Sequence, residues 1–509
     1  MSNQSNTKRI ARNTLMLYFR QILIMAVSLY TVRIVLNVLG AEDYGIYNVV
    51  AGVVTMFGFL SGAMATASQR YFSFDLGKGD TENLKKTFSV TLAIYALLAL
   101  LIVLLAETVG LWFVYNKLVI PSERLTAAKW IYQAAVASFL FTLITTPYMS
   151  AIIAHENMDV YAYVSIVEVA LKLGIVFLLQ VLPFDKLIVY GFLLLVVAII
   201  NTSLYRFYCI KKYEECRFRF LWDKALFKDM LDFTSWTLFG QFTSIVRNQA
   251  VTVLFNQFFT PVVVAARSLS LQVTNAVNVF SQNFNTSLYP PIIKEYSSGN
   301  KDAMYKLLYN GCKMTFFLMW VFTLPLILNM QVVLSLWLKN VPEWTVLFTQ
   351  LALVEVLINS LGQPIATAAR APGKMKTYEL SLGSLQLVIF VLSWILFKAG
   401  YQAWVSFAIA IGVNLVMMVL RLVLVHGLVG LPLRQFTIKT VIPLLLMMAV
   451  SFTFAFLMNC FMPKGLLSSF VQIFITVPVT CLVMYFLGMN REQRKMVVDI
   501  VKRKIGKKI

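Results

Sequence analysis

Long apolar runs alternate with short polar segments along the whole chain. Most runs hold about 20 apolar residues, the length that a helix needs to cross a bilayer. Their periodicity is that of a helix rather than of ten-residue alternating strands, which favours a helical membrane bundle over a β-barrel. Fourteen helices are predicted, at approximately residues 13–39, 45–69, 87–115, 127–153, 160–182, 187–209, 230–256, 261–289, 305–331, 344–368, 377–398, 402–425, 438–460 and 465–488.

Composition supports the same class of protein. Of the 509 residues, 59% are hydrophobic and 13% are charged, and the mean hydropathy is +0.75. Soluble proteins have about 45–50% apolar and about 25% charged residues. The chain therefore holds too few polar residues to cover a surface in water, which excludes a soluble multidomain enzyme, a disordered protein and a secreted disulfide scaffold. We predict an all-α polytopic membrane protein.

Basic residues are distributed unevenly between the two sides of the predicted bundle. The chain has 44 Lys and Arg against 23 Asp and Glu, a net charge of +21. With fourteen helices, 31 basic residues fall on the side of both termini, 7 on the other side and 6 within helices. Because membrane proteins concentrate Lys and Arg in cytoplasmic loops, this predicts a multi-pass inner-membrane protein with both termini in the cytoplasm. The asymmetry also explains the basicity without nucleic acid as a partner.

The sequence contains no catalytic or metal-binding pattern. The two histidines, His155 and His426, are far apart, and the five cysteines form no CxxC pair. The chain lacks a Walker loop, HExxH, GxSxG and a DxD pair of carboxylates. We therefore predict no catalytic residue, no metal ion and no cofactor.

The two halves of the chain repeat each other at an offset near 220 residues. Five ordered matches carry this interpretation, and the alternative is chance similarity between apolar sequences. Repeats with an even number of helices usually pack around an axis along the membrane normal, with the substrate path between them. We predict an N-terminal lobe at 1–210, a cytoplasmic linker at 211–229, a C-terminal lobe at 230–425, and two further transmembrane helices with a basic cytoplasmic tail at 426–509. The matched pairs are Asn37/Asn256, Gly79/Gly299, Pro147/Pro364, Met158/Met375 and Tyr161/Tyr378.

Four segments resemble polysaccharide-transport proteins of the O-antigen flippase type. They are RNTLMLYFRQ (12–21), VRIVLNVLGAEDYGIYNVVAGVV (32–54), PVVVAARSLSLQV (261–273) and LYPPIIKEYSSGN (288–300). Such proteins belong to the multidrug/oligosaccharidyl-lipid/polysaccharide (MOP) exporter superfamily, and the resemblance covers about residues 10–425. It implies two six-helix lobes, alternating access, and movement of a lipid-linked oligosaccharide across the inner membrane. The lipid bilayer, a glycan polymerase and glycosyltransferases are the partners expected of such a protein.

Polar residues within the predicted helices indicate where a substrate binds. In the helix at 261–289, hydroxyls and amides follow Arg267 along one face, and the helix at 230–256 repeats this less clearly around Arg247. A hydrated pathway is favoured, and the alternative is hydrogen bonding between helices. Arg33 lies near the outer end of the first helix, where snorkelling and cavity lining are equally compatible with the sequence. The predicted cavity residues are Arg33, Arg247, Arg267, Thr274, Asn278, Gln282 and Asn285.

Other charged residues within helices require partners, because an ionised side chain at mid-bilayer costs about 2.5–3.5 kcal/mol. Lys172 follows Glu168 by four residues, which favours an ion pair within one helix and leaves ion coupling as the minor interpretation. Glu355 has no partner nearby in sequence, so it is either protonated or paired across helices. Arg20 and Lys313 lie about two turns from helix ends, where snorkelling is expected.

Three functions are compatible with these features. The first is a flippase for a polyprenyl-diphosphate-linked oligosaccharide, because arginine forks bind diphosphate oxygens bidentately and amides suit a sugar. The second is a cation-coupled multidrug exporter of the same superfamily, which would place acidic residues in its cavity. The third is a membrane-bound glycosyltransferase, which short outer loops without an acidic cluster disfavour. The sequence favours the flippase.

Overall fold

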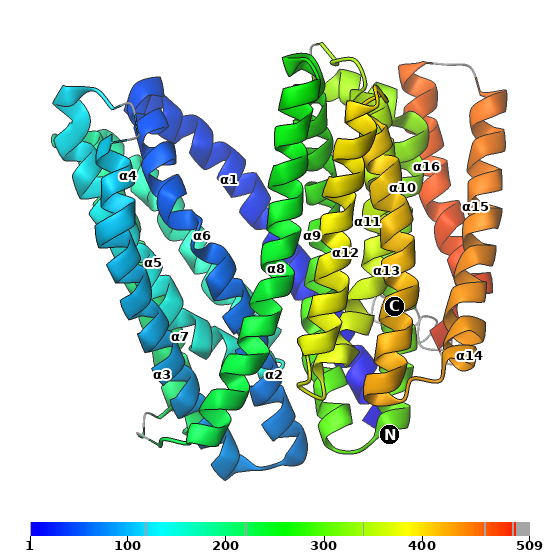
Figure 1. Cartoon of the computed structure of the whole chain (residues 1–509), viewed down its shortest axis with the longest axis horizontal. Coiled ribbons are helices and arrows are strands. Elements are labelled where there is room, and N and C mark those ends of the chain that lie inside the picture. The colour runs from blue at the N-terminus through cyan, green and yellow to red at the C-terminus, as the bar shows by residue number, and fades with distance from the viewer. Residues whose placement is uncertain are drawn as a thin grey trace, which may run out of the picture. The chain divides into compact units, whose positions relative to one another are not determined.

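The computed structural model describes residues 2–116, 118, 120–217, 219, 221–338, 340–462, 465–490 and 493–494. Within these residues the chain forms helices and no β-strand, as Figure 1 shows. Short π-helical and 3-10 turns extend or connect some of the α-helices. The α-helices are α1 (Ser2–Thr55), α2 (Gly58–Lys78), α3 (Thr81–Leu105), α4 (Leu111–Asn116), α5 (Leu125–Ala154), α6 (Met158–Val181), α7 (Lys186–Lys212), α8 (Lys224–Phe258), α9 (Pro261–Ser297), α10 (Lys301–Trp337), α11 (Thr345–Arg370), α12 (Lys376–Lys398), α13 (Val405–Val429), α14 (Leu433–Phe436), α15 (Ile442–Phe461) and α16 (Leu466–Val483).

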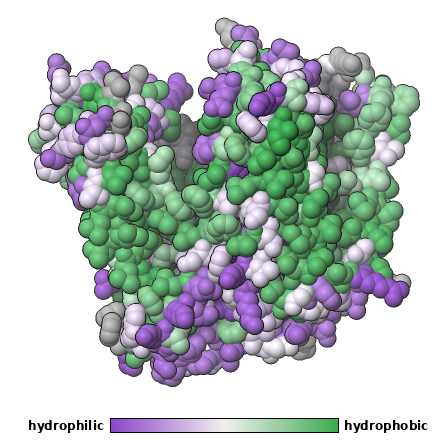
Figure 2. All heavy atoms as spheres, in the orientation of Figure 1, coloured by the Kyte–Doolittle hydropathy of each residue, from purple (hydrophilic) through white to green (hydrophobic). Residues whose placement is uncertain are grey.

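The all-helical membrane class is confirmed, whereas the count of fourteen spans is not. Among the described residues, 11 helices are long and apolar enough to cross a membrane, or 12 if one bent pair counts as a single span. Figure 2 shows apolar side chains over the middle of the helices and polar ones toward their ends. Helices α8 and α9 lie where two further spans are predicted, but they are not among these candidates. Their apolar surface is interrupted by amides, hydroxyls and arginines.

The second predicted helix, at 45–69, is in fact bent. Helix α1 contains a break at Gly40, where φ is 80° and ψ is 168°. A second bend of 47° separates the segment Glu42–Val54 from α2. Glycine permits the first break because it has no Cβ to clash at positive φ. Hydropathy alone cannot locate such bends, since the apolar run continues through them.

The described chain divides into two compact units. Unit 1 comprises Met1–Phe242 and Tyr289–Lys301, and unit 2 comprises Thr243–Leu288 and Asp302–Ile509. The predicted lobes end at 210 and begin again at 230, so the compact units divide the chain differently from the predicted repeats. Helices α8 and α9 each contribute to both units, because part of each helix packs with the first repeat. The division into repeats stays a prediction.

Helices α15 and α16, predicted as a separate pair, belong to unit 2. The Trp320 indole on α10 donates to Ser451 Oγ on α15 at 2.8 Å, and Gln472 Nε2 on α16 donates to the carbonyl of Ala455 at 3.1 Å. These bonds satisfy polar groups that lipid could not, so they fix the position of the pair within unit 2. The predicted basic tail lies outside the described residues except for 493–494.

The backbone is the same at several positions related by the predicted repeat. Gly79 after α2 and Gly299 after α9 both have positive φ, of 72° and 80°. Pro147 and Pro364 both lie inside helices, α5 and α11. A left-handed glycine after a helix and a proline within a membrane helix are both common, so the duplication stays a prediction.

At one pair of positions related by the predicted repeat, the residue types differ but the backbone conformation is the same. Glu156 has φ of 62°, and Gly373, 217 positions later, has φ of 84°. The Glu156 side chain is fully buried, where it accepts a hydrogen bond from Lys294 Nζ at 2.8 Å and pairs with Arg9 Nε at 2.7 Å. A left-handed conformation is unfavourable for glutamate, so these contacts must hold it there. The corner between α5 and α6 thereby joins α1 to the end of α9 within unit 1.

Candidate functional site

Arg247 on α8 lies at the centre of a buried polar network in unit 2. Its Nη1 donates to Glu355 Oε1 on α11 at 2.8 Å, and its Nη2 donates to Asn248 Oδ1 at 2.9 Å. Glu355 Oε1 also accepts a hydrogen bond from Asn414 Nδ2 on α13 at 3.2 Å. The Arg247 and Glu355 side chains are each 14% exposed. Of the two states that the sequence allowed for Glu355, pairing across helices is the one observed.

Arg267 on α9 lies beside this network and is 5% exposed. Its guanidinium carbon lies 5.0 Å from the ring centre of Phe255 and 5.8 Å from that of Phe407. Nη2 makes a long hydrogen bond of 3.4 Å to the carbonyl of Asn248. Among the described residues, no carboxylate lies within 4.0 Å of Arg267, whereas Arg247 has one. Asn248 therefore contacts both arginines, and of the two it is Arg247 that pairs with a glutamate among the described residues.

An aromatic cluster positions the Arg267 side chain. The Phe255 ring lies 5.5 Å from Phe397 and 5.9 Å from Phe348 in edge-to-face contact, and Phe407 closes the cluster. A cation over aromatic faces gains about 0.5–2 kcal/mol, more when water is excluded. The low local dielectric also strengthens any charge interaction that the two arginines make. The Nε atoms of both arginines are buried without a hydrogen-bond partner among the described residues, which leaves donors for an anion.

The hydroxyls and amides predicted to follow Arg267 along one face of α9, the polar stripe, lie in different environments. Ser270, Thr274 and Ser281 are buried inside unit 2, and the first two donate to carbonyls of their own helix at 2.7 and 3.0 Å. Asn285 Nδ2, half-buried, donates to Gln363 Oε1 on α11 at 2.7 Å. Hydrogen bonding between helices, the alternative interpretation, therefore describes Ser281 and Asn285, which both donate to Gln363 on α11. Whether Thr274 or Asn285 contacts a substrate stays a prediction.

A neighbouring face of α9 carries the exposed polar groups. Gln282 is exposed and Asn278 is half-buried, and the exposed face continues through residues that the sequence analysis did not select. It also missed Asn248 and Asn414, although an amide next to an arginine and an amide in an apolar helix were available signals. The additional exposed residues of α9 are Ser268, Gln272 and Asn275.

The remaining predicted site residues, Arg33, Glu168 and Lys172, belong to unit 1. Arg33 on α1 is exposed. Lys172 Nζ donates to Glu168 Oε1 at 2.6 Å, so the ion pair expected from their spacing is present. Asn201 Nδ2 on α7 donates to the other Glu168 oxygen at 3.2 Å. Both members of the pair are partly exposed, and a coupling role for them stays a prediction.

The expectation that Lys313 and Arg20 snorkel is wrong for Lys313. This lysine of α10 is fully buried, and its Nζ donates to the carbonyl of Gly488 at 3.2 Å, at the end of the last helix. Terminal helix carbonyls have no partner in their own helix and attract cations. Arg20 is half-buried, with its guanidinium carbon 4.4 Å from the ring centre of Tyr161.

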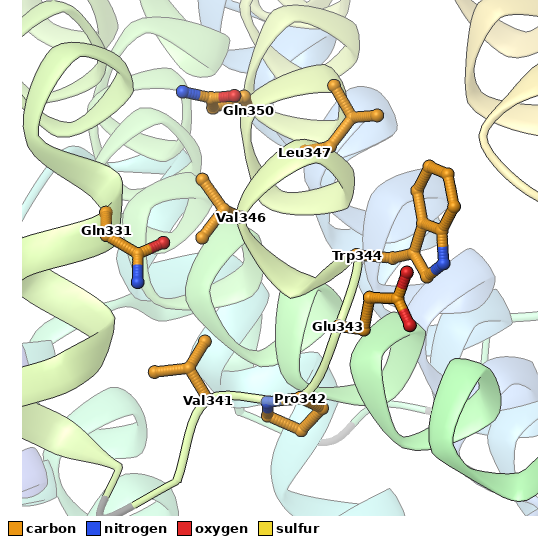
Figure 3. A pocket seen from close by; sticks show the side chains of 8 residues that line it. All are labelled: Gln331, Val341, Pro342, Glu343, Trp344, Val346, Leu347 and Gln350. Carbon is orange, nitrogen blue, oxygen red and sulfur yellow. The ribbon is translucent and has the colours of Figure 1, made fainter.

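A surface pocket of about 400 Å³ lies at the corner between α10 and α11, and Figure 3 shows Glu343 and Trp344 side by side on the loop there. A similar pocket of about 380 Å³ lies at the α4–α5 corner of unit 1, where Gln133 takes the place of Gln350 at an offset of 217. Neither pocket is lined by a predicted site residue. The first is lined by Gln331, Val341, Pro342, Glu343, Trp344, Val346, Leu347 and Gln350.

Solved structures with a similar fold are membrane transporters. One MATE structure, in complex with MaD3S, is 12% identical with a TM-score of 0.73, covering 83% of this chain and 97% of that one. An outward-facing multidrug resistance MATE family transporter of the MOP superfamily is 11% identical, with a TM-score of 0.70 and coverage of 83% and 96%. A MOP superfamily transporter from Pyrococcus furiosus, described by the reverse polarity of its binding pocket, is 13% identical, with a TM-score of 0.68 and coverage of 83% and 96%.

The protein is therefore a multi-pass membrane protein that shares the fold of these transporters. Residues 10–296, more than half of the chain, match the family described as Polysaccharide biosynthesis protein, and the chain belongs to that family. No curated protein sequence matches the chain. The resemblance found in the sequence is thus confirmed for the family, and the fold is that of solved MOP superfamily transporters.

Proposed function

We propose that the protein is a flippase that moves a polyprenyl-diphosphate-linked oligosaccharide, such as an O-antigen or capsule unit, across the bacterial inner membrane by alternating access. The observation that carries this proposal is that Arg247 and Arg267 both contact Asn248, while among the described residues Glu355 is the one carboxylate within 4.0 Å of either arginine. One positive charge is left for a substrate anion. Guanidinium groups bind phosphate oxygens in a planar, bidentate geometry, so a lipid diphosphate suits the site.

Uncharged polar groups on the two helices that carry the arginines suit the sugar part of such a substrate. Gln272, Asn275 and Gln282 are exposed on α9, and Asn248 is exposed on α8. Amides both donate and accept hydrogen bonds, which matches the hydroxyl groups of a glycan. In this role, glycosyltransferases would supply the substrate and a glycan polymerase would use the product.

The second candidate is a cation-coupled multidrug exporter, which the similarity to a multidrug resistance transporter brings into consideration. Cationic drugs require carboxylates that are available in the cavity. Here Glu355 is paired with Arg247, and Glu168 is paired with Lys172. The carboxylates named by the sequence analysis are thus already neutralised, which favours an anionic substrate.

Complementation separates the two functions. We expect the protein to restore surface glycan in a bacterial strain that lacks its own flippase but makes the matching lipid-linked unit. The same expression level should leave drug susceptibility unchanged in a strain that lacks its multidrug exporters. Restored drug resistance without restored glycan would contradict the flippase and support the exporter.

Both termini are proposed to lie in the cytoplasm, because the predicted topology assigns 31 basic residues to their side of the membrane and 7 to the other. Reporter fusions after Lys228 and Asn490 should therefore be cytoplasmic. Fusions after Asn116 and Glu343 should be periplasmic. A periplasmic fusion at Asn490 would be inconsistent with an even number of spans.

A further inference from the structure

We infer that Glu355 is an internal competitor for the substrate's diphosphate, occupying Arg247 until the substrate displaces it. This inference rests on the proposed function and adds a specificity and release determinant to it. Glu355 lies on α11, and its carboxylate pairs with Arg247 on α8 at 2.8 Å. It thus belongs to a different helix from either arginine, and it can move away without either arginine leaving the site.

The two terminal nitrogens of Arg247 are already occupied by oxygens. Glu355 Oε1 accepts from Nη1 at 2.8 Å, and Asn248 Oδ1 accepts from Nη2 at 2.9 Å. Two phosphate oxygens would take these same positions in a bidentate complex. A diphosphate that binds the Nη1–Nη2 face of Arg247 must therefore displace the charged occupant, Glu355.

Asn414 on α13 keeps the Glu355 carboxylate close to Arg247 when a diphosphate takes its place. It is 2% exposed, and its Nδ2 donates to Glu355 Oε1 at 3.2 Å and to the carbonyl of Ala410 at 2.7 Å. A Glu355 carboxylate that leaves Arg247 keeps this hydrogen bond, so it is not left without a partner. Asn414 is therefore a positioning residue that keeps the competitor close to the arginine.

Arg267 determines which anions can displace Glu355 from Arg247. Among the described residues it has no carboxylate within 4.0 Å, and its Nε has no hydrogen-bond partner. A diphosphate can engage both arginines, whereas Glu355 engages only Arg247. A monophosphate has fewer oxygens and less charge for the same exchange. The site should therefore select diphosphates over monophosphates.

Competition also assists release of the substrate. When Glu355 returns to Arg247, the diphosphate loses one of its two cationic partners, and its affinity falls. Without the competitor, the substrate would bind more tightly and leave more slowly. Uniformly tighter binding does not increase turnover. Removal of the Glu355 charge should thus improve binding and impair transport together.

The test uses the purified full-length protein in detergent with geranyl diphosphate as a soluble probe. Calorimetric titration should show that Glu355→Gln binds the probe at least about 10-fold more tightly than the wild type, since a charge-assisted contact contributes about that factor or more. Geranyl monophosphate should bind more weakly than the diphosphate to both proteins. Asn414→Ala should shift affinity in the same direction by a smaller factor.

Glu379→Gln is the matched control. Glu379 is also a buried glutamate of unit 2, but it is not part of the Arg247 network. Its replacement should leave affinity for geranyl diphosphate unchanged. Glu355→Asp provides a second variant if Glu355→Gln does not fold, because the shorter side chain withdraws the carboxylate from Arg247 and should also tighten binding. In the complemented strain, Glu355→Gln should export less glycan than the wild type at equal protein level.

The outcomes separate this inference from the proposed function. If the wild type binds the probe through Arg267 but Glu355→Gln and Glu355→Asp bind no more tightly, Glu355 is only a structural counterion and the inference is overturned. If neither the wild type nor Glu355→Gln binds geranyl diphosphate, both the inference and the anionic site are overturned. Tighter binding combined with weaker export supports the inference.

Discussion

Arg267→Ala should leave the protein inserted in the membrane while sharply reducing glycan export. The change removes the guanidinium that has no carboxylate partner within 4.0 Å among the described residues. A charge-assisted hydrogen bond contributes about 1.5–3 kcal/mol, so affinity for a lipid diphosphate should fall about 10- to 150-fold. Surface polysaccharide in a flippase-deleted strain, at matched protein level, is the measurement.

Two further substitutions identify the cause of the loss. Arg267→Lys keeps the charge but loses the planar group that lies over Phe255, so it should restore export only in part. Arg434 is an exposed arginine of unit 2, and Arg434→Ala should have little effect. Full export by Arg267→Ala would mean that the substrate anion does not depend on this site, although flipping could proceed through other contacts.

Arg247 requires a double variant because its removal affects Glu355 as well. Arg247→Ala leaves that carboxylate with Asn414 as its remaining partner in the network. An unpaired buried charge destabilises a protein by itself. Arg247→Ala combined with Glu355→Gln removes this effect, so any export defect that remains in the double variant reports the lost substrate contact.

Glu156→Ala should destabilise the protein by on the order of 3 kcal/mol, as expected when one partner of a buried ion pair is removed. The fully buried carboxylate compensates Lys294 and Arg9, and alanine leaves both cations without it. Alanine also retains the unfavourable φ of 62°. Thermal unfolding of the purified protein in detergent measures the effect.

The conformational part of this effect can be separated from the charge. Glu156→Gly also removes the carboxylate, but glycine adopts positive φ readily, so it should be more stable than Glu156→Ala by about 1 kcal/mol. The related position in the second repeat is Gly373, with φ of 84°. Glu123 is exposed, and Glu123→Gln should behave like the wild type. Equal stability of all the Glu156 variants and the wild type would show that the ion pairs do not hold the corner.

The sequence by itself determined the class of the protein and the approximate position of most of its helices. Apolar runs long enough to cross a bilayer leave no other class, because a polar surface cannot be built from 13% charged residues. It also singled out Arg247 and Arg267 as charged residues on the polar faces of two consecutive helices, α8 and α9.

Only the tertiary structure decided which partners these charges have. Glu355 is 108 residues from Arg247, and Gly488 is 175 residues from Lys313, so no local pattern connects them. The same holds for the polar stripe of α9, because periodicity defines a face but not what packs against it. Thr274 is buried and Gln282 exposed for this reason. Local spacing therefore specifies helices and their faces, whereas burial and charge pairing depend on which helices pack together.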